Sequence, residues 1–260
     1  MKTPFFEELE YAHTAIGELI LQRRRVAALG DRETYEVKLG DAYLMSSLFH
    51  DAEDALAERV LSRLNGEQWD VVVGGLGLGY TAAEALRRPE VRELVVVEAL
   101  APVIDWHERN LVPNGEFLTS DPRCRYQEGD FFAMAGGEGF DPARPGRQFD
   151  AVLLDIDHSP RHTLSPAHDD FYTVEGLRRL VRFLKPGGLF GLWSNDPPED
   201  EFIDRMNGVF AKAEGLTIPF ANPLTDGEES NGLYIGFNGR CGKEDMAEGD
   251  EFGRHQTPSR

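Results

Sequence analysis

Cysteine and long apolar runs are both scarce in this sequence. Cys124 and Cys241 are its two cysteines, they lie in unrelated contexts, and they offer no zinc-ligand spacing. So few cysteines fit a reducing compartment. No run of about 18 or more apolar residues occurs, so we expect no membrane-spanning helix. The opening residues, MKTPFFEELEYAH, carry acids where a secretion signal has basic residues and an apolar stretch, which favours a cytoplasmic location.

Basic residues are outnumbered by acids. The 27 Lys and Arg against 46 Asp and Glu give a formal net charge of −19. A surface that binds phosphate backbones must be basic, so we expect no nucleic-acid partner. Two interpretations of the acidic charge stay open. An acidic field would gather a cationic substrate such as a polyamine, whereas a solvated acidic surface would simply keep the protein soluble.

The first 50 residues predict a small antiparallel β-unit. Alternation of apolar and polar residues is typical of half-buried strands, and Gly-Asp pairs are typical of turns. Residues 1–15 are expected to form a helical or irregular lead. The expected strands cover residues 17–26, 35–39 and 43–45, with turns at Gly30-Asp31 and Gly40-Asp41.

Strands and helices alternate from residue 51 to residue 237. This alternation predicts an α/β fold with a doubly wound, mostly parallel, seven-stranded sheet and helices on both faces. Residues 238–260 are polar and acidic and are expected to be a disordered tail. Strands are expected near residues 71–73, 93–97, 125–127, 149–154, 189–193, 216–220 and 232–237, and helices near 51–64, 81–88, 101–110, 170–184 and 201–213, with a loop over 135–147.

A glycine-rich turn joins the first strand of this domain to its helix. The glycines Gly75, Gly77 and Gly79 alternate with leucines. Glycine lets the backbone adopt positive φ and approach a ligand closely, and the following helix presents free N–H groups to that ligand. A dinucleotide fingerprint would place the third glycine three positions after the second, so the pyrophosphate interpretation is disfavoured. A tight turn without a ligand is the alternative.

Acidic residues follow the next two strands. Glu98 ends the run Val95-Val96-Val97, about 20 residues after the glycines, where a carboxylate accepts hydrogen bonds from ribose hydroxyls. Gly129 and Asp130 follow the weak strand near 125–127, and Asp130 could bond the exocyclic amine of an adenine. The alternative is a helix-capping or solvent-exposed acid at Glu98 and a turn acid at Asp130.

Two more acids, Asp155 and Asp157, follow the strong strand at 149–154. Ligands bind beyond the carboxyl ends of such strands, so both side chains are expected to face the cleft. A carboxylate there can orient a cationic amine and accept its proton as the nitrogen attacks a carbon atom. His158, His162 and His168 lie nearby, but their spacing matches no metal-ligand pattern, and no metal is expected.

At these residues the sequence resembles the spermidine synthase family of the class I methyltransferase-like superfamily, over most of residues 16–236. The resemblance implies S-adenosylmethionine or its decarboxylated form as co-substrate, a small-molecule amine or other nucleophilic acceptor, and a homodimer formed through the N-terminal β-unit. It implies that Glu98 binds ribose, Asp130 contacts adenine and Asp155 is catalytic. The segments that carry it are GGLGLGYT, VVVEAL, EGDFF, FDAVLLDIDHSP, DDFYTVEGLRRLVRFLKPGGLFGLWSNDPP and the N-terminal LGDAYLMSS.

The sequence departs from the family pattern around the amine substrate. Leu78 stands where the glycine loop of the family usually carries an acid, and Leu44 or Met45 replaces a glutamine. The loop Asp155–Pro160 is shorter than the family's double-aspartate loop. Three hypotheses follow: aminopropyl transfer to an amine, with Asp155 as base and Asp157 as an amine contact; methyl transfer to a small molecule or protein; and a non-catalytic nucleotide-binding protein.

Overall fold

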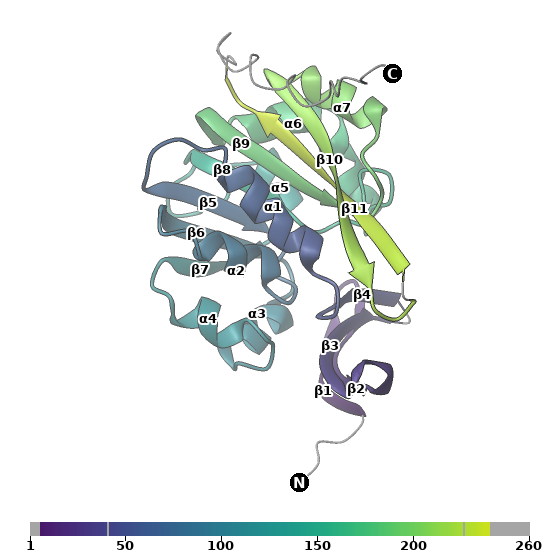
Figure 1. Cartoon of the computed structure of the whole chain (residues 1–260). Coiled ribbons are helices and arrows are strands. Elements are labelled where there is room, and N and C mark those ends of the chain that lie inside the picture. The colour runs from purple at the N-terminus through teal and green to yellow at the C-terminus, as the bar shows by residue number, and fades with distance from the viewer. Residues whose placement is uncertain (1–5, 41, 226, 240–260) are drawn as a thin grey trace, which may run out of the picture.

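The computed structural model describes residues 6–40, 42–225 and 227–239. It contains a seven-stranded sheet with helices on both faces and a separate four-stranded sheet formed by the N-terminal residues (Figure 1). The predicted α/β class, the mostly parallel sheet and the N-terminal antiparallel unit are confirmed. The domain boundaries at residues 50 and 237 stay a prediction, and most of the expected tail, residues 240–260, lies outside the described residues.

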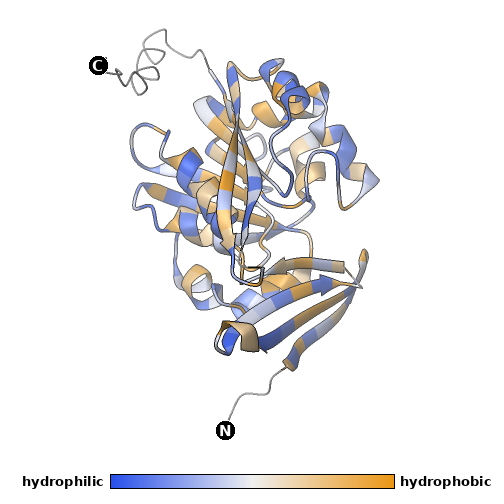
Figure 2. Cartoon of the chain, turned by 45° about the vertical axis from the view of Figure 1, so that its right-hand side comes forward, coloured by the Kyte–Doolittle hydropathy of each residue, from blue (hydrophilic) through white to orange (hydrophobic). Residues whose placement is uncertain are grey.

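The N-terminal sheet has the order β1-β2-β3-β4, with every neighbouring pair antiparallel. The expectation of a helical or irregular lead over residues 1–15 is wrong for the described part, because Phe6–Thr14 pairs along its length with the second strand. Its exposure alternates, as expected for a strand with one face toward solvent. Figure 2 shows hydrophilic and hydrophobic residues alternating along the strands of this sheet. The strands are β1 (Phe6–Thr14), β2 (Gly17–Val26), β3 (Arg32–Leu39) and β4 (Ala42–Ser46), with the 3-10 turn η1 (Ala27–Leu29) after β2.

The large sheet has the order β10-β11-β9-β8-β5-β6-β7. Strands β5 to β9 run parallel to one another. At one edge of the sheet, β11 pairs antiparallel with β9, and β10 pairs antiparallel with β11. The predicted strand at 189–193 is longer than expected, because pairing extends back through the Lys-Pro-Gly-Gly segment. The strands are β5 (Trp69–Gly74), β6 (Val91–Glu98), β7 (Cys124–Glu128), β8 (Phe149–Leu154), β9 (Leu184–Ser194), β10 (Lys212–Asn222) and β11 (Gly227–Phe237).

Four of the helical segments differ from the prediction. The helix expected over 201–213 ends at Asn207, because the chain pairs with β11 from Lys212 onward. Two six-residue helices, α4 and α5, were not predicted, and α5 overlaps the loop expected at 135–147. The helix expected from residue 170 begins at Val174, because the Thr173 hydroxyl caps the Gly176 N–H and a 3-10 turn precedes it. The helices are α1 (Asp51–Leu61), α2 (Tyr80–Leu86), α3 (Ala101–Glu108), α4 (Gly115–Ser120), α5 (Phe131–Gly136), η2 (Pro166–Tyr172), α6 (Val174–Val181) and α7 (Asp200–Asn207).

Strand register brings the predicted site segments to one edge of the large sheet. Gly74, at the end of β5, pairs with Val97 of β6 on one side and with Leu154 of β8 on the other. Glu98 pairs with Glu128 of β7. The glycine loop, Glu98, Gly129 and the start of the loop at Asp155 therefore all leave the sheet at the same carboxyl edge.

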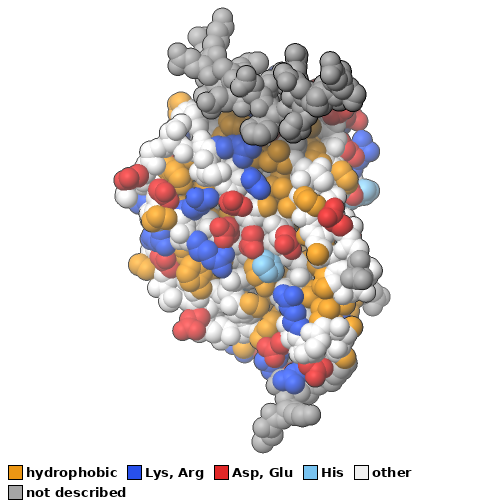
Figure 3. All heavy atoms as spheres, in the orientation of Figure 1, with side chains coloured by type: hydrophobic (Ala, Val, Ile, Leu, Met, Phe, Trp, Pro, Cys, Tyr) orange, Lys and Arg blue, Asp and Glu red, His pale blue; other side chains and the backbone are white. Residues whose placement is uncertain are grey.

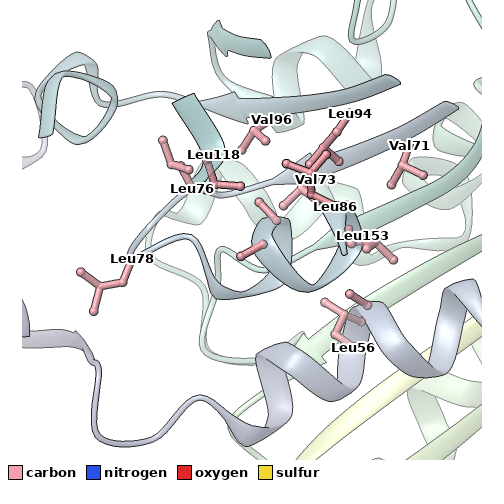
Figure 4. Close-up of a cluster of buried hydrophobic side chains, with 14 of the residues drawn as sticks. Leu56, Val71, Val73, Leu76, Leu78, Leu86, Leu94, Val96, Leu118 and Leu153 are labelled. Carbon is pink, nitrogen blue, oxygen red and sulfur yellow. The ribbon is translucent and has the colours of Figure 1, made fainter. Parts of the chain in front are cut away.

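Two apolar clusters, one on each face, hold this sheet. One joins α1 and α2 to alternate residues of β5 and β6, and Figure 4 shows Leu56 of α1 below Val73, Leu86 and Leu153. The other is rich in aromatic rings and packs α5, α6 and α7 against the opposite face. Continuous apolar runs such as Val71–Val73 of β5 follow from burial on both faces of the sheet. The rigid sheet fixes the positions of the loops at its edge.

A cluster of ion pairs lies at the opposite, amino edge of the sheet. The nearly buried Arg147 guanidinium contacts Asp70 at 3.2 Å, Glu93 at 2.7 Å and Asp141 at 3.0 Å. Hydrogen bonds from Arg147 and neighbouring arginines hold the pKa of Glu93 below its usual range. On the face shown in Figure 3, acidic and basic side chains are interspersed.

In the described part of the chain, no helix is both long and apolar enough to cross a membrane.

Candidate active site

A cavity of about 350 Å³ opens at the carboxyl edge of the large sheet, and residues of the N-terminal sheet form part of its wall. That volume lies within the usual range for a small-molecule site. Its wall combines apolar side chains from β2, β3 and β4 with the glycine loop and the ends of β6 and β8. The charged and histidine residues on the wall are Glu53, Glu98, Asp130, Asp155, His158 and His168.

The glycine loop uses positive φ at all three predicted positions. Gly75, Gly77 and Gly79 have φ of +94°, +50° and +84°, and all three line the cavity. A Cβ at Gly75 would lie 2.0 Å from the carbonyl oxygen of Asp155, so only glycine fits between β5 and the loop after β8. The absence of a side chain at Gly75 therefore lets the loop pack directly against the carboxyl end of β8.

His107 of α3 supports this loop from behind. It is fully buried, and its Nε2 lies 3.0 Å from the carbonyl oxygen of Gly77, so Nε2–H donates there. Burial lowers the pKa of His107 to about 4, which keeps the ring neutral. Asn114 adds a second tie, because its side-chain N–H₂ donates to the Leu78 carbonyl at 3.0 Å. Neither residue was predicted, since nothing in their spacing relates them to the glycines.

Glu98 connects the glycine loop to the end of β6. One carboxylate oxygen accepts from the Leu76 N–H at 2.9 Å and the other from the Leu100 N–H at 2.9 Å. Burial raises the pKa of Glu98, and these backbone N–H groups oppose the shift. Each carboxylate oxygen can accept a further bond, and Glu98 lines the cavity. Hydroxyl groups of a ligand could therefore bond to it there.

Gly129 and Asp130 also lie on the cavity wall. One carboxylate oxygen of Asp130 accepts from the N–H groups of Phe132 at 2.9 Å and Ala133 at 3.2 Å, which caps α5. The sequence left a turn acid as the alternative at Asp130, and the structure shows that this side chain caps a helix. The second carboxylate oxygen remains available to a ligand, because capping occupies only one of the two.

Asp155 follows β8 directly and lines the cavity. The Thr81 hydroxyl, from the first turn of α2, donates to its Oδ2 at 2.8 Å. Burial raises the pKa of Asp155 to about 6, and the bond from Thr81 opposes that shift. A carboxylate with this pKa is suited to accept a proton near neutral pH.

Asp157 does not face the cavity, so the expectation that both aspartates do so holds for Asp155 alone. Its buried carboxylate accepts from the Leu164 N–H at 2.7 Å and the Tyr172 hydroxyl at 2.8 Å, and it lies 2.8 Å from Nδ1 of His168. The chain turns away from the strand after Leu154, which directs Asp157 into the protein. This side chain organises the loop and the 3-10 turn η2.

No group of three or more histidine, cysteine or acidic side chains with metal-binding geometry occurs among the described residues. His162 lies 3.0 Å from Asp196, and His168 is engaged by Asp157. Burial raises the pKa of the Cys124 thiol to about 12, so it stays protonated and unreactive. Cys241 lies outside the described residues.

Comparison with known proteins gives the same relationship from sequence and from fold. No family model matches the chain. The polyamine aminopropyltransferase of Mycobacterium tuberculosis is 26% identical over 189 residues, 73% of this chain and 33% of the relative. That of Nitrosomonas europaea is 35% identical over 129 residues, 49% of this chain and 35% of the relative. The chain thus aligns with about a third of the length of these relatives.

A solved spermidine synthase in complex with the transition state analogue AdoDATO shares the fold, with a TM-score of 0.67 and 16% identity over 89% of this chain and 74% of that one. The chain is therefore similar to polyamine aminopropyltransferases in sequence and to a spermidine synthase in fold. This relationship covers both the N-terminal sheet and the large sheet, since the superposition spans nearly all of the described residues.

Against the spermidine synthase pattern, the structure places one unpredicted acid in the cavity. Leu78 occupies the loop position where the family usually has an acid; it is 3% exposed and lies to one side of the core cluster (Figure 4). Glu53, the third residue of α1, lines the same cavity. The sequence carries little signal for Glu53, because Asp51 and Asp54 are acids of the same helical turn and helical spacing alone relates none of them to Asp155.

Proposed function

We propose that this chain transfers an aminopropyl group from decarboxylated S-adenosylmethionine to a small amine. The observation that carries the proposal is the charge of the cavity wall. Four carboxylates line it, those of Glu53, Glu98, Asp130 and Asp155, and no Lys or Arg does so among the described residues. S-adenosylmethionine carries a carboxylate that would be repelled here, whereas the decarboxylated donor is wholly cationic beyond its nucleoside.

The residues present fit such a donor. The three loop glycines line the cavity without side chains, and Glu98 offers carboxylate oxygens for ribose hydroxyls. Gly129 and the free oxygen of Asp130 lie where an adenine could contact them. The names of the relatives and the AdoDATO complex support the same assignment.

The proposed reaction is a direct displacement at carbon. The lone pair of the acceptor nitrogen attacks the methylene carbon bound to the sulfonium, the C–S bond breaks, and its electron pair returns to sulfur. The products are the alkylated amine and the neutral thioether methylthioadenosine. The proton lost by the nitrogen passes to the carboxylate of Asp155 and then to solvent. Holding both reactants in line supplies much of the rate.

A donor comparison tests the proposal. The purified chain is incubated with decarboxylated S-adenosylmethionine or with S-adenosylmethionine, each with a panel of aliphatic diamines, and the nucleoside product is identified by chromatography and mass spectrometry. We expect methylthioadenosine from the decarboxylated donor. Release of S-adenosylhomocysteine with a methylated acceptor would instead establish methyl transfer, and the Asp155→Asn variant serves as the inactive control. The homodimer and the cytoplasmic location stay predictions.

A further inference from the structure

We infer that Glu53 is a donor-binding residue, which together with Asp155 holds the ammonium end of the donor's aminopropyl arm. This inference rests on the proposed function and names a substrate contact within the same site. It assigns to helix α1 a carboxylate that the glycine loop does not carry, because Leu78 is apolar.

The first support is position. Glu53 and Asp155 both line the cavity, one from the first turn of α1 and the other from the end of β8. The Thr81 hydroxyl lies 2.8 Å from Oδ2 of Asp155 and 3.4 Å from the backbone carbonyl of Glu53, so it lies between the two segments. Gly75 contacts the Asp155 backbone directly, which places this pair of acids beside the loop that would hold the nucleoside.

The second support is electrostatic. Burial, followed by the Asp155 carboxylate, raises the pKa of Glu53 well above its usual range, and Asp54 and Asp51 act in the same direction. Two desolvated carboxylates that repel each other cannot both ionise at low cost unless a cation joins them. The known hydrogen bonds to the pair come from uncharged groups, the Thr81 hydroxyl and the backbone N–H of Glu53.

The third support is the match to an alkylammonium group. An ammonium ion offers three N–H donors, and each of the two carboxylates keeps free acceptor positions. The neighbouring wall, which includes Leu19, Val37 and Leu44, suits the methylene groups of the arm. A metal ion is a poorer fit, because no third ligand completes a metal site among the described residues.

Calorimetry with two nucleosides tests the inference. Methylthioadenosine lacks an amine, whereas S-adenosyl-3-thiopropylamine carries the aminopropyl arm on the same thioether nucleoside. In the Glu53→Gln variant we expect affinity for the amine nucleoside to fall at least tenfold and affinity for methylthioadenosine to stay within twofold. Glu58→Gln changes an exposed acid on the same helix and is the matched control; it should alter neither affinity.

The outcomes separate this inference from the proposed function. Unchanged affinity of Glu53→Gln for both nucleosides overturns the inference alone. Equal losses for both nucleosides, together with a lower melting temperature, also overturn it, because Glu53 would then act on the fold rather than on the amine. Failure of the wild-type chain to bind either nucleoside overturns the proposed function as well.

Discussion

Comparison of Gly75→Ala with Gly66→Ala separates two reasons for a glycine at position 75: its positive φ and the lack of room for a Cβ atom. Gly75 has φ +94°, and a Cβ there would lie 2.0 Å from the Asp155 carbonyl oxygen. Gly66, in the loop before β5, has a similar φ of +83° but no atom within 4 Å of its Cβ position. Gly66→Ala should therefore cost about 1–2 kcal/mol, the strain of a left-handed residue alone.

Gly75→Ala carries that strain and a steric overlap with backbone, which adds about 1–3 kcal/mol. We expect a loss of about 2–5 kcal/mol in the free energy of unfolding, measured by urea titration, and at least a tenfold loss of methylthioadenosine affinity, since either the glycine loop or Asp155 must move. Equal destabilisation of the two variants, with native nucleoside affinity in Gly75→Ala, would refute the close packing of loop and strand.

Three further changes probe other parts of the site. Glu98→Ala should weaken methylthioadenosine binding by about 1–3 kcal/mol in calorimetry, the scale of hydrogen bonds to a charged group; no effect would contradict the ribose contact. Asp155→Asn should lower kcat by about 10²–10⁴-fold, and the wild-type rate at saturating substrates should fall below pH about 6, because the base must be ionised; a flat profile from pH 5 to 7 would contradict this role. His107 takes up its proton at about pH 4 when folded but near pH 6.5 when unfolded. Protonation of His107 therefore stabilises the unfolded state as the pH falls from about 6.5 to about 4. Urea titrations at pH 7 and pH 4 measure how much of the free energy of unfolding is lost on acidification, and His107→Gln should reduce that loss by about 3 kcal/mol. An unchanged loss would contradict a buried, neutral His107 ring.

Two strands, β2 and β8, were predictable from the sequence to the residue, whereas β5 and β6 extend beyond their predicted bounds. The expected bounds of β2 and β8 match the structure, because alternation in one and a continuous apolar run in the other have no competing interpretation. The helices α4 and α5 have six residues each, too few for a helical period to show. Residues 6–14 pair with β2, and that long-range pairing outweighs a weak local preference.

The candidate site was also only partly predictable from the sequence. Gly75, Gly77, Gly79, Glu98, Asp130 and Asp155 follow their strands directly, so the common edge of a parallel sheet brings them to one cavity. Asp157 lies only two positions further, yet the chain has left the strand by then and its side chain bonds internally. Glu53 and His107 reach the site through packing of α1 and α3, and such contacts leave no mark in residue spacing.

The most direct test is a crystal structure of the chain with methylthioadenosine. We predict the adenosine along the turn formed by Gly75 to Gly79, with both ribose hydroxyls within hydrogen-bond distance of the Glu98 carboxylate and the sulfur facing Asp155. A nucleoside bound elsewhere, or a cavity that stays filled by protein side chains at saturating ligand, would contradict the account.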